Sequence, residues 1–376
     1  MVSITDFSEK LDSFKQLLIH LINIESPSTE KQSVDYLGEY IQEELSNLGA
    51  AVSVDEQSEA GNNVIGQWNS SSSESGILLL SHMDTVFESG TLQKRPVRVE
   101  NNKLYGPGAQ DMKASIAILL ETIRWLRGTD QLPSRPITAL FTSDEETGSD
   151  HSQSLITDFA SRSILTLCLE PSLPNGALKT ARKGTGDIKI TALGRATHAG
   201  SDHENGRNAI EELAYHILNA QKLTDYSRGT TVNVGVIHGG TRTNVVPDKA
   251  IALFDFRVSS NDEADRIRVW ANNERPVIHG TQIKISVRQD RPPMPRDRMM
   301  EQTFKKAQVI AKSIGLEISE GSTGGGSDAN YVAPLGVPVL DGLGALGEGA
   351  HSEREFIYLD SLPERAALLA AILTEW

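Results

Sequence analysis

Residues 76–84 read Gly-Ile-Leu-Leu-Leu-Ser-His-Met-Asp, an apolar run that ends in His82 and Asp84. A short run of this kind, bounded by glycine and polar residues, is typical of a strand buried on both faces. Similar runs occupy residues 63–68, 136–142 and 164–169. The sequence therefore predicts a sheet whose strands are enclosed by other layers of structure.

Helical patterns precede and separate these runs. Apolar residues recur with helical periodicity over residues 4–22 and 29–48, and residues 111–127 are apolar on most sides before Gly128. Strands that are buried on both faces and alternate with helices indicate an α/β fold with helical layers on a central sheet.

The pattern changes near Lys179 and returns after a proline-rich turn at residues 291–295. The elements predicted between these points are strands at 187–193, 231–237, 250–258 and 282–288 and helices at 208–221 and 263–273. A helix at 301–314, a strand at 337–340 and a helix at 362–373 resume the α/β pattern. Since 376 residues exceed the roughly 250 to 300 at which one core stops growing, we predict two domains. Residues 1–179 and 294–376 would form a catalytic domain, interrupted by an inserted α+β domain at 180–293.

Composition limits the partners and the compartment. Lys and Arg number 36 against 50 Asp and Glu, and the net charge of −14 disfavours nucleic acid and anionic membranes as partners. The longest apolar stretch, residues 366–373, is far shorter than the ~20 residues that span a bilayer. Charged residues interrupt residues 1–22, so we expect neither a membrane span nor a signal peptide. With Cys168 as the single cysteine, we expect a cytoplasmic protein without an intrachain disulfide.

Potential metal ligands follow the apolar runs. In open α/β sheets ligands bind beyond the carboxyl ends of the strands, so these side chains are expected to converge. They are His82, Asp111, Glu146, Glu170 and His351. Two imidazoles and three carboxylates suit Zn²⁺ or Co²⁺. If Asp111 bridges through both oxygens, the set divides into two three-ligand sites roughly 3.5 to 4 Å apart.

Two further acids have expected roles beside these ligands. Asp84 is placed to accept the second ring N–H of His82 and so to orient the imidazole. In extended chain, Glu145 and Glu146 would point to opposite sides, so that Glu146 ligates while Glu145 faces the substrate. Glu145 is therefore the candidate general base for an activated water.

Several motifs in order resemble the di-zinc exopeptidases and deacylases. That family includes glutamate carboxypeptidase of the carboxypeptidase G type, acetylornithine deacetylase and succinyl-diaminopimelate desuccinylase, and the glutamate carboxypeptidase branch is the most similar. The motifs are Ser-His82-Met-Asp84, Gly-Ala-Gln110-Asp111-Met-Lys113, Asp-Glu145-Glu146-Thr-Gly, Leu-Glu170-Pro, Ala-Thr-His198-Ala-Gly, Asn244-Val-Val-Pro, Asp255-Phe-Arg257, Gly-Gly-Gly-Ser327-Asp328-Ala and Gly-Ala-His351-Ser. The chain departs from the family at Gln110 and Ala114-Ser115, which puts the fine fit of the substrate in doubt.

The resemblance implies a zinc-exopeptidase-like catalytic domain with a mixed central sheet, and a ferredoxin-like lid through which the chain forms a homodimer. It implies two Zn²⁺ per chain, for which Co²⁺ is a possible substitute. His82, Asp111 and Glu170 would hold one ion, and Asp111, Glu146 and His351 would hold the other.

For the lid, the resemblance implies residues that meet the substrate. His198 would donate to the developing oxyanion in the partner's active site, while Asn244 and Arg257 hold the substrate's carboxylate. Arg291 would face a second, side-chain carboxylate. A planar guanidinium suits bidentate carboxylate binding, and a donor aimed at a tetrahedral oxygen is worth about 2.7 to 4 kcal/mol.

Simpler interpretations of single residues stay open at this point. Asp111 could be a helix N-cap or first-turn acid, and Asp328 could cap the helix after the glycine loop. Arg257 could pair with Asp255. For Arg291 a solvated surface charge is an alternative, and for Asn244 a turn before Pro247.

The sequence thus predicts hydrolysis of an amide bond that releases an amino acid with a free carboxylate, by a di-zinc-activated water with Glu145 as base. A glutamate-carboxypeptidase-like enzyme is favoured; the alternatives are an N-acyl amino acid deacylase and a dipeptidase. Substrates would be small peptides or N-acyl amino acids, and the acyl group is left open. Two alternatives lie outside this class. One is a serine hydrolase that uses Ser327, because residues 325–329 nearly fit a nucleophile elbow. The other is a metal-dependent binding protein without turnover.

Overall fold

The computed structural model describes residues 2–376, which form two compact units. The larger unit contains the residues up to Ala181, together with Arg296–Thr323 and Ser327–Trp376. The smaller unit contains Arg182–Pro295 and Gly324–Gly326. Each unit has its own hydrophobic core.

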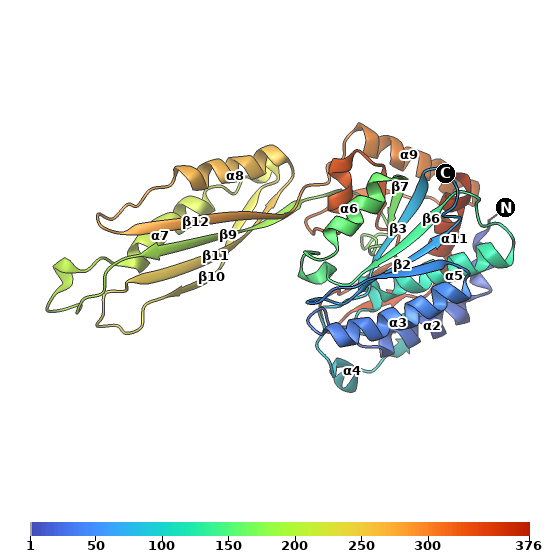
Figure 1. The fold of residues 1–376 in the computed structure, drawn as a ribbon, viewed down its shortest axis with the longest axis horizontal. Coiled ribbons are helices and arrows are strands. Elements are labelled where there is room, and N and C mark those ends of the chain that lie inside the picture. Colours follow the sequence, from blue (N-terminus) through green and yellow to red (C-terminus); the bar gives the residue numbers. More distant parts are fainter. Residues whose placement is uncertain (1) are drawn as a thin grey trace. The chain divides into compact units, whose positions relative to one another are not determined.

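An eight-stranded sheet forms the centre of the larger unit (Figure 1). Its strands, in spatial order, are β1 (Ala51–Asp55), β2 (Asn63–Trp68), β6 (Ile137–Thr142), β3 (Gly76–His82), β7 (Ser163–Cys168), β14 (Val339–Asp341), β8 (Leu178–Arg182) and β13 (Glu320–Thr323). The strands β6, β3, β7 and β14 run parallel, whereas β2 and β8 pair antiparallel with their neighbours. The predicted α/β fold with a mixed central sheet is confirmed.

Helices lie on both sides of this sheet (Figure 1). The helices of the larger unit are α1 (Ile4–Ser8), α2 (Leu11–Asn23), α3 (Lys31–Asn47), α4 (Thr91–Lys94), α5 (Ala114–Gly128), α6 (Gln153–Ser161), α9 (Arg298–Ser313), α10 (Ala329–Val332) and α11 (Ser361–Glu375). The helix α5 is buried along nearly its whole length and packs on α2 and α11, which explains why its sequence is apolar on most sides.

Two predicted helices differ from the structure. The helix expected at 4–22 is divided into α1 and α2, because Ser3 and Asp6 cap a short first helix and the backbone at Lys10 is not helical. The helix expected from residue 111 begins at Ala114. Asp111 lies in an irregular turn at φ −116° and ψ 94°, so the N-cap and first-turn interpretations of Asp111 are wrong.

A second, small sheet of the larger unit was not predicted. It has the strand order β15 (Gly347–Glu348), β16 (Phe356–Tyr358), β5 (Lys103–Tyr105) and β4 (Arg98–Glu100). These strands are two or three residues long, too short to show a sequence period. Because β16 pairs with β5, the start of the loop after β5 lies beside the end of the loop before β16.

The smaller unit is a four-stranded antiparallel sheet with two helices. Along the chain its elements are β9 (Gly184–Leu193), α7 (Ala209–Gln221), β10 (Thr231–Gly239), β11 (Lys249–Val258), α8 (Asn261–Asn273) and β12 (Gln282–Arg291). The strand order β10-β11-β9-β12 is that of the ferredoxin-like βαββαβ motif, as expected. Apolar residues of β9, β11, α7 and α8 form its core.

Among the described residues, no helix combines the length and apolar character that crossing a bilayer requires.

Candidate metal centre

Three parallel strands deliver polar side chains to one edge of the large sheet. β3 ends at His82, β6 leads into a 3-10 turn at Glu145–Thr147, and β7 is followed closely by Glu170. Since β6, β3 and β7 are direct neighbours, their carboxyl ends bring these residues together. Asp111 and His351 come to the same place from loops.

The His82 ring is buried, and its orientation is fixed through Nδ1. Its Nδ1 donates to the main-chain oxygen of Asp84 at 3.0 Å, and the carboxylate Oδ1 of Asp84 lies 3.4 Å from the same nitrogen. The other ring nitrogen, Nε2, therefore faces the remaining groups. It lies 3.1 Å from Asp111 Oδ1 and 3.7 Å from Glu170 Oε1.

The second oxygen of Asp111 faces a different imidazole. His351 Nε2 lies 3.3 Å from Asp111 Oδ2 and 3.0 Å from Glu146 Oε2. The five predicted ligands thus fall into two groups that share Asp111: His82 with Glu170 on one side, His351 with Glu146 on the other. His351 itself is held at φ 61° and its side chain is 52% exposed.

The electrostatics of this cluster favour a cation. Hydrogen bonds that the His351 ring donates to the carboxylates of Asp111 and Glu146 raise the pKa of His351 to about 11. Burial alone would raise the pKa of Asp111, but hydrogen bonds with His351 and His82 hold it well below its usual value. Burial raises the pKa of Glu146, and its buried Oε1 has no hydrogen-bond partner among the described residues. An excess of carboxylates with an unsatisfied oxygen and two imidazoles is a donor set that fits divalent zinc or cobalt.

Glu145 lies beside the His82 group. It is 8% exposed, and His82, Glu145 and Glu170 each offer a ligand atom within 4.8 Å of the others. The expectation that Glu145 and Glu146 lie in extended chain is wrong, because both lie in the 3-10 turn. The Asp84 carboxylate fixes this turn by accepting the backbone N–H groups of Glu145 and Glu146, each at 3.2 Å.

In the smaller unit, His198 is exposed and its ring is oriented by the backbone. Its Nδ1 accepts N–H groups from Gly200 and Ser201, both at 3.1 Å. In the neutral ring the proton is therefore on Nε2, which is a donor. The Asn244 carbonyl accepts the Ala199 N–H at 2.9 Å, so the Asn244 loop lies next to His198.

The other candidates have defined partners or surroundings. Arg257 pairs with Asp255 at 2.8 Å through Nη2 and at 3.0 Å through Nε, as its simpler interpretation predicted. Arg291 is 8% exposed, so the solvated-charge interpretation is wrong. The capping interpretation of Asp328 is also wrong: its side chain makes no cap hydrogen bond, and it accepts from Thr142 Oγ1 at 2.9 Å.

Residues 78–375 match the model of peptidase family M20/M25/M40. The chain belongs to this family. The resemblance stated from its motifs is thereby confirmed, and membership places this M20 chain among the metallohydrolases.

Relatives and solved structures cover three quarters or more of the M20 chain. Carboxypeptidase G2 from Pseudomonas sp. is 30% identical over 362 residues, which cover 94% of this chain and 87% of that protein. Succinyl-diaminopimelate desuccinylase from Stenotrophomonas maltophilia is 27% identical over 305 residues, covering 76% of this chain and 80% of that protein.

Two solved structures show the same fold. A tripeptidase from Staphylococcus aureus has a TM-score of 0.80 at 23% identity and covers 100% of this chain and 98% of its own. A dinuclear metal-binding M20 peptidase from Bacillus subtilis has a TM-score of 0.68 at 15% identity, covering 98% of each chain.

Sequence reasoning missed two polar residues beside the metal centre of the M20 chain, Lys179 and Glu355, and noted Gln110 only as a departure from the family pattern. Lys179 Nζ lies 3.8 Å from Glu170 Oε2. Gln110 and Glu355 are buried and bond to the loops that carry Asp111 and His351. Only the placement of Gln110 next to Asp111 was a signal; Lys179 and Glu355 stand in charged, featureless segments.

Proposed function

We propose that this chain is a di-zinc hydrolase that cleaves an amide bond and releases an amino acid with a free carboxylate. The observation that carries the proposal is the division of the ligand set around the two oxygens of Asp111, with Glu145 beside it. His82, Asp111 and Glu170 would hold one ion, and Asp111, Glu146 and His351 would hold the other. When bound, such a pair polarises the scissile carbonyl and lowers the pKa of a water molecule towards about 7.

Glu145 is the proposed general base. Its carboxylate accepts the proton of the attacking water and then delivers it to the leaving nitrogen. Asp84 supports this role from behind, because its carboxylate holds the Glu145 turn while its main-chain oxygen orients His82. One buried residue thus fixes both a ligand and the base.

Residues of the smaller unit are proposed to bind the substrate. His198 presents Nε2–H, the donor that an oxyanion needs, and Arg257, Asn244 and Arg291 hold the carboxylates of the substrate. The ion pair with Asp255 keeps the Arg257 guanidinium in a fixed orientation. If a substrate carboxylate replaced Asp255 as the partner of Arg257, the guanidinium would still be paired with one negative charge.

A glutamate-carboxypeptidase-like activity is the substrate assignment we favour. Its support is the 30% identity with carboxypeptidase G2 over 94% of the chain. The desuccinylase relatives, at 26 to 28% identity, keep N-acyl amino acid deacylation as the second candidate, and a dipeptidase as the third. The serine-hydrolase alternative has little support, because Ser327 is completely buried and a nucleophile elbow exposes its serine. A binding protein without turnover would have no use for Glu145.

A substrate screen with the zinc-loaded protein tests this proposal. N-acyl amino acids and dipeptides that differ only in the leaving residue (Glu, Asp, ornithine or a neutral residue) are compared by kcat/KM. We expect the glutamate series to be hydrolysed best, because the lid offers two arginines. A metal chelator should abolish the activity, and a serine-directed phosphonate should leave it unchanged. Preference for ornithine or neutral leaving residues would transfer the assignment to the deacylase or dipeptidase candidate.

We further propose a homodimer formed through the smaller unit, in which His198 serves the partner's active site. β10 is an edge strand, and Val236 and Ile237 on it are 41% and 54% exposed. On the helix α7, Ile210 and Leu218 are 43% and 64% exposed. Apolar side chains on an edge strand and an adjacent helix are typical of a surface that is covered by another chain.

Sedimentation equilibrium tests the dimer. The wild type should have twice the chain mass of 40.9 kDa, and Ile237→Asp should shift it towards the monomer and lower kcat, because His198 would no longer reach a partner. Val269→Asp is the matched control. Val269 is 58% exposed, like Ile237, but it lies on the helix α8 and belongs neither to β10 nor to α7. A monomeric wild type with full activity would refute the dimer.

A further inference from the structure

A buried carboxylate, Glu355, holds the loop that carries Asp111. Glu355 is 1% exposed, and its Oε1 accepts the backbone N–H groups of Gln110 at 2.8 Å and Asp111 at 3.0 Å. Its Oε2 accepts the N–H of Gly108 at 2.9 Å. The backbone of this loop is irregular at Asp111, so these amides have no helical partners. One carboxylate therefore satisfies three donors of the turn that aims Asp111.

The same contact joins the two loops of the centre. Glu355 follows His351 in the connection between β15 and β16, and β16 pairs with β5, which leads into the Asp111 loop. Gln110 makes a second link in the opposite direction, because its buried side-chain oxygen accepts the Ala350 N–H at 3.2 Å. The first link reaches the amide of Asp111 itself from Glu355, four residues after His351. The second joins Gln110, next to Asp111, to Ala350, next to His351. Together they join the backbone of the Asp111 loop to the loop that carries His351.

The ligands differ in how they are supported. His82 is the last residue of the central strand β3, and Glu170 follows the neighbouring strand β7, so the sheet itself positions them. Asp111 and His351 stand on loops of the small sheet. An ion held by Asp111, Glu146 and His351 would depend on two ligands from these loops, whereas an ion held by His82, Asp111 and Glu170 would depend on one.

We infer that Glu355, assisted by Gln110, is a positioning residue for the ion held by Asp111, Glu146 and His351. This inference rests on the proposed two-ion function. The carboxylate acts through the backbone of the Asp111 loop and touches neither ion nor substrate. Glutamine at position 355 would keep the shape of the side chain but would replace one acceptor oxygen by an NH₂ group, which cannot accept from the loop amides.

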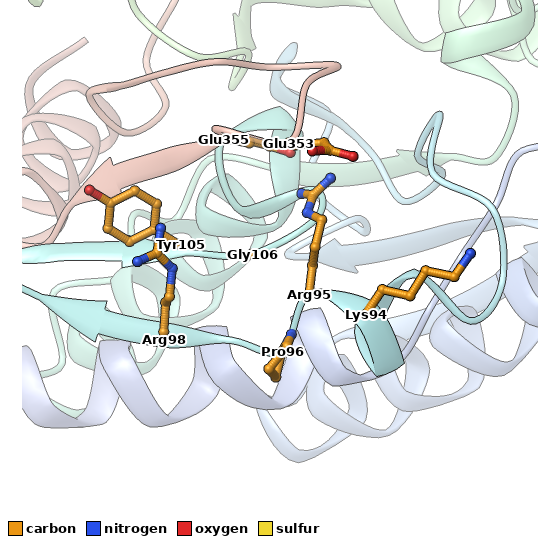
Figure 2. A pocket seen from close by; sticks show the side chains of 8 residues that line it. All are labelled: Lys94, Arg95, Pro96, Arg98, Tyr105, Gly106, Glu353 and Glu355. Atoms are coloured by element: carbon orange, nitrogen blue, oxygen red, sulfur yellow. The ribbon is translucent and has the colours of Figure 1, made fainter.

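A matched control lies in the same surface cavity. Glu355 and Glu353 line a cavity of about 280 Å³, with Lys94, Arg95 and Arg98 around it (Figure 2). Glu353 is exposed, and no hydrogen bond to the Asp111 loop is found for it among residues 2–376. Glu353→Gln therefore removes the same charge from the same cavity without removing the loop contact.

The test is zinc binding to the full chain, measured by competition with a chelating dye in the wild type, Glu355→Gln, Gln110→Ala and Glu353→Gln. We expect Glu355→Gln to bind the more weakly held ion about 10- to 100-fold less tightly and Gln110→Ala to show a smaller loss in the same direction. Glu353→Gln should bind both ions like the wild type. At limiting zinc, kcat of Glu355→Gln should fall with KM unchanged, and saturating zinc should restore kcat.

The outcomes separate this inference from the function on which it rests. If the wild type binds no pair of zinc ions, the proposed function fails. If the wild type binds two and a folded Glu355→Gln binds both with unchanged affinity, only the positioning role is refuted. Should circular dichroism show that Glu355→Gln is unfolded, Gln110→Ala decides: wild-type zinc affinity in that variant refutes the inference. A lowered thermal stability with unchanged zinc affinity would likewise identify Glu355 as merely structural.

Discussion

Replacement of Glu145 by glutamine is expected to lower kcat by about 10²-fold or more while the protein keeps two zinc ions. Glutamine has nearly the same shape, but it cannot accept a proton from water at neutral pH. The 3-10 turn should persist, because Asp84 bonds to the backbone of residues 145 and 146 and not to the Glu145 side chain. Steady-state kinetics and elemental analysis of zinc measure the two quantities independently.

Glu348→Gln is a suitable control for this loss. Glu348 is an exposed carboxylate on β15, three residues before His351, and has no expected part in the chemistry. Its substitution should leave kcat within about twofold of the wild type, as is usual for exposed positions away from special features. Normal turnover in Glu145→Gln would reject Glu145 as the base. Loss of zinc in the same variant would instead indicate that Glu145 is itself a ligand, as its distance to His82 and Glu170 permits.

Asp111→Asn is expected to have the larger effect, because it removes the one charge that both groups of ligands share. Asp111 Oδ1 faces His82 and Oδ2 faces His351, so an amide in this place leaves one of the two ions without its bridging oxygen. The zinc content should fall from about two to about one per chain or less. Loss of several kcal/mol of transition-state stabilisation corresponds to at least about 10³-fold in kcat/KM.

Metal removal from the wild type provides the comparison. Chelation should abolish activity and added zinc should restore it, whereas added zinc should not restore Asp111→Asn. Because Asp111 is hydrogen bonded in the cluster, the thermal stability of the apo-proteins is measured beside the kinetics. An Asp111→Asn variant that binds two zinc ions and turns over normally would contradict the bridging role, and with it the two-ion arrangement.

The predicted strands show where sequence patterns suffice. Residues 63–68 form β2 as expected, and the run that ends at His82 forms the central strand β3. Apolar runs in this fold are buried on both faces, so composition alone marks them. Helix boundaries were less predictable, because α1 ends after Ser8 although apolar residues continue with helical spacing into α2. The capping box of Ser3 and Asp6 competes there with the longer helix.

In the candidate site, too, some features could be predicted from the sequence and others could not. Its ligands, its base and its lid residues were predicted from residue type, position after apolar runs and resemblance, and their roles remain predictions. The turn at Glu145, the ion pair of Arg257 and the burial of Arg291 depend on neighbours that are distant in sequence, and local patterns carry no information about them.

The sequence by itself determined the α/β class, the inserted ferredoxin-like unit and the family, because hydrophobic periodicity and ordered motifs are local properties of the chain. Only the tertiary structure decided that the two oxygens of Asp111 face different imidazoles and that Glu355 and Gln110 tie together loops about 240 residues apart. The physical reason is that these contacts join segments distant in sequence, and the pairing of β5 with β16 places the Asp111 loop beside the His351 loop. Hydrogen-bond geometry of this kind depends on which distant segments pair. Strands of two or three residues are too short to show a sequence period from which that pairing could be predicted.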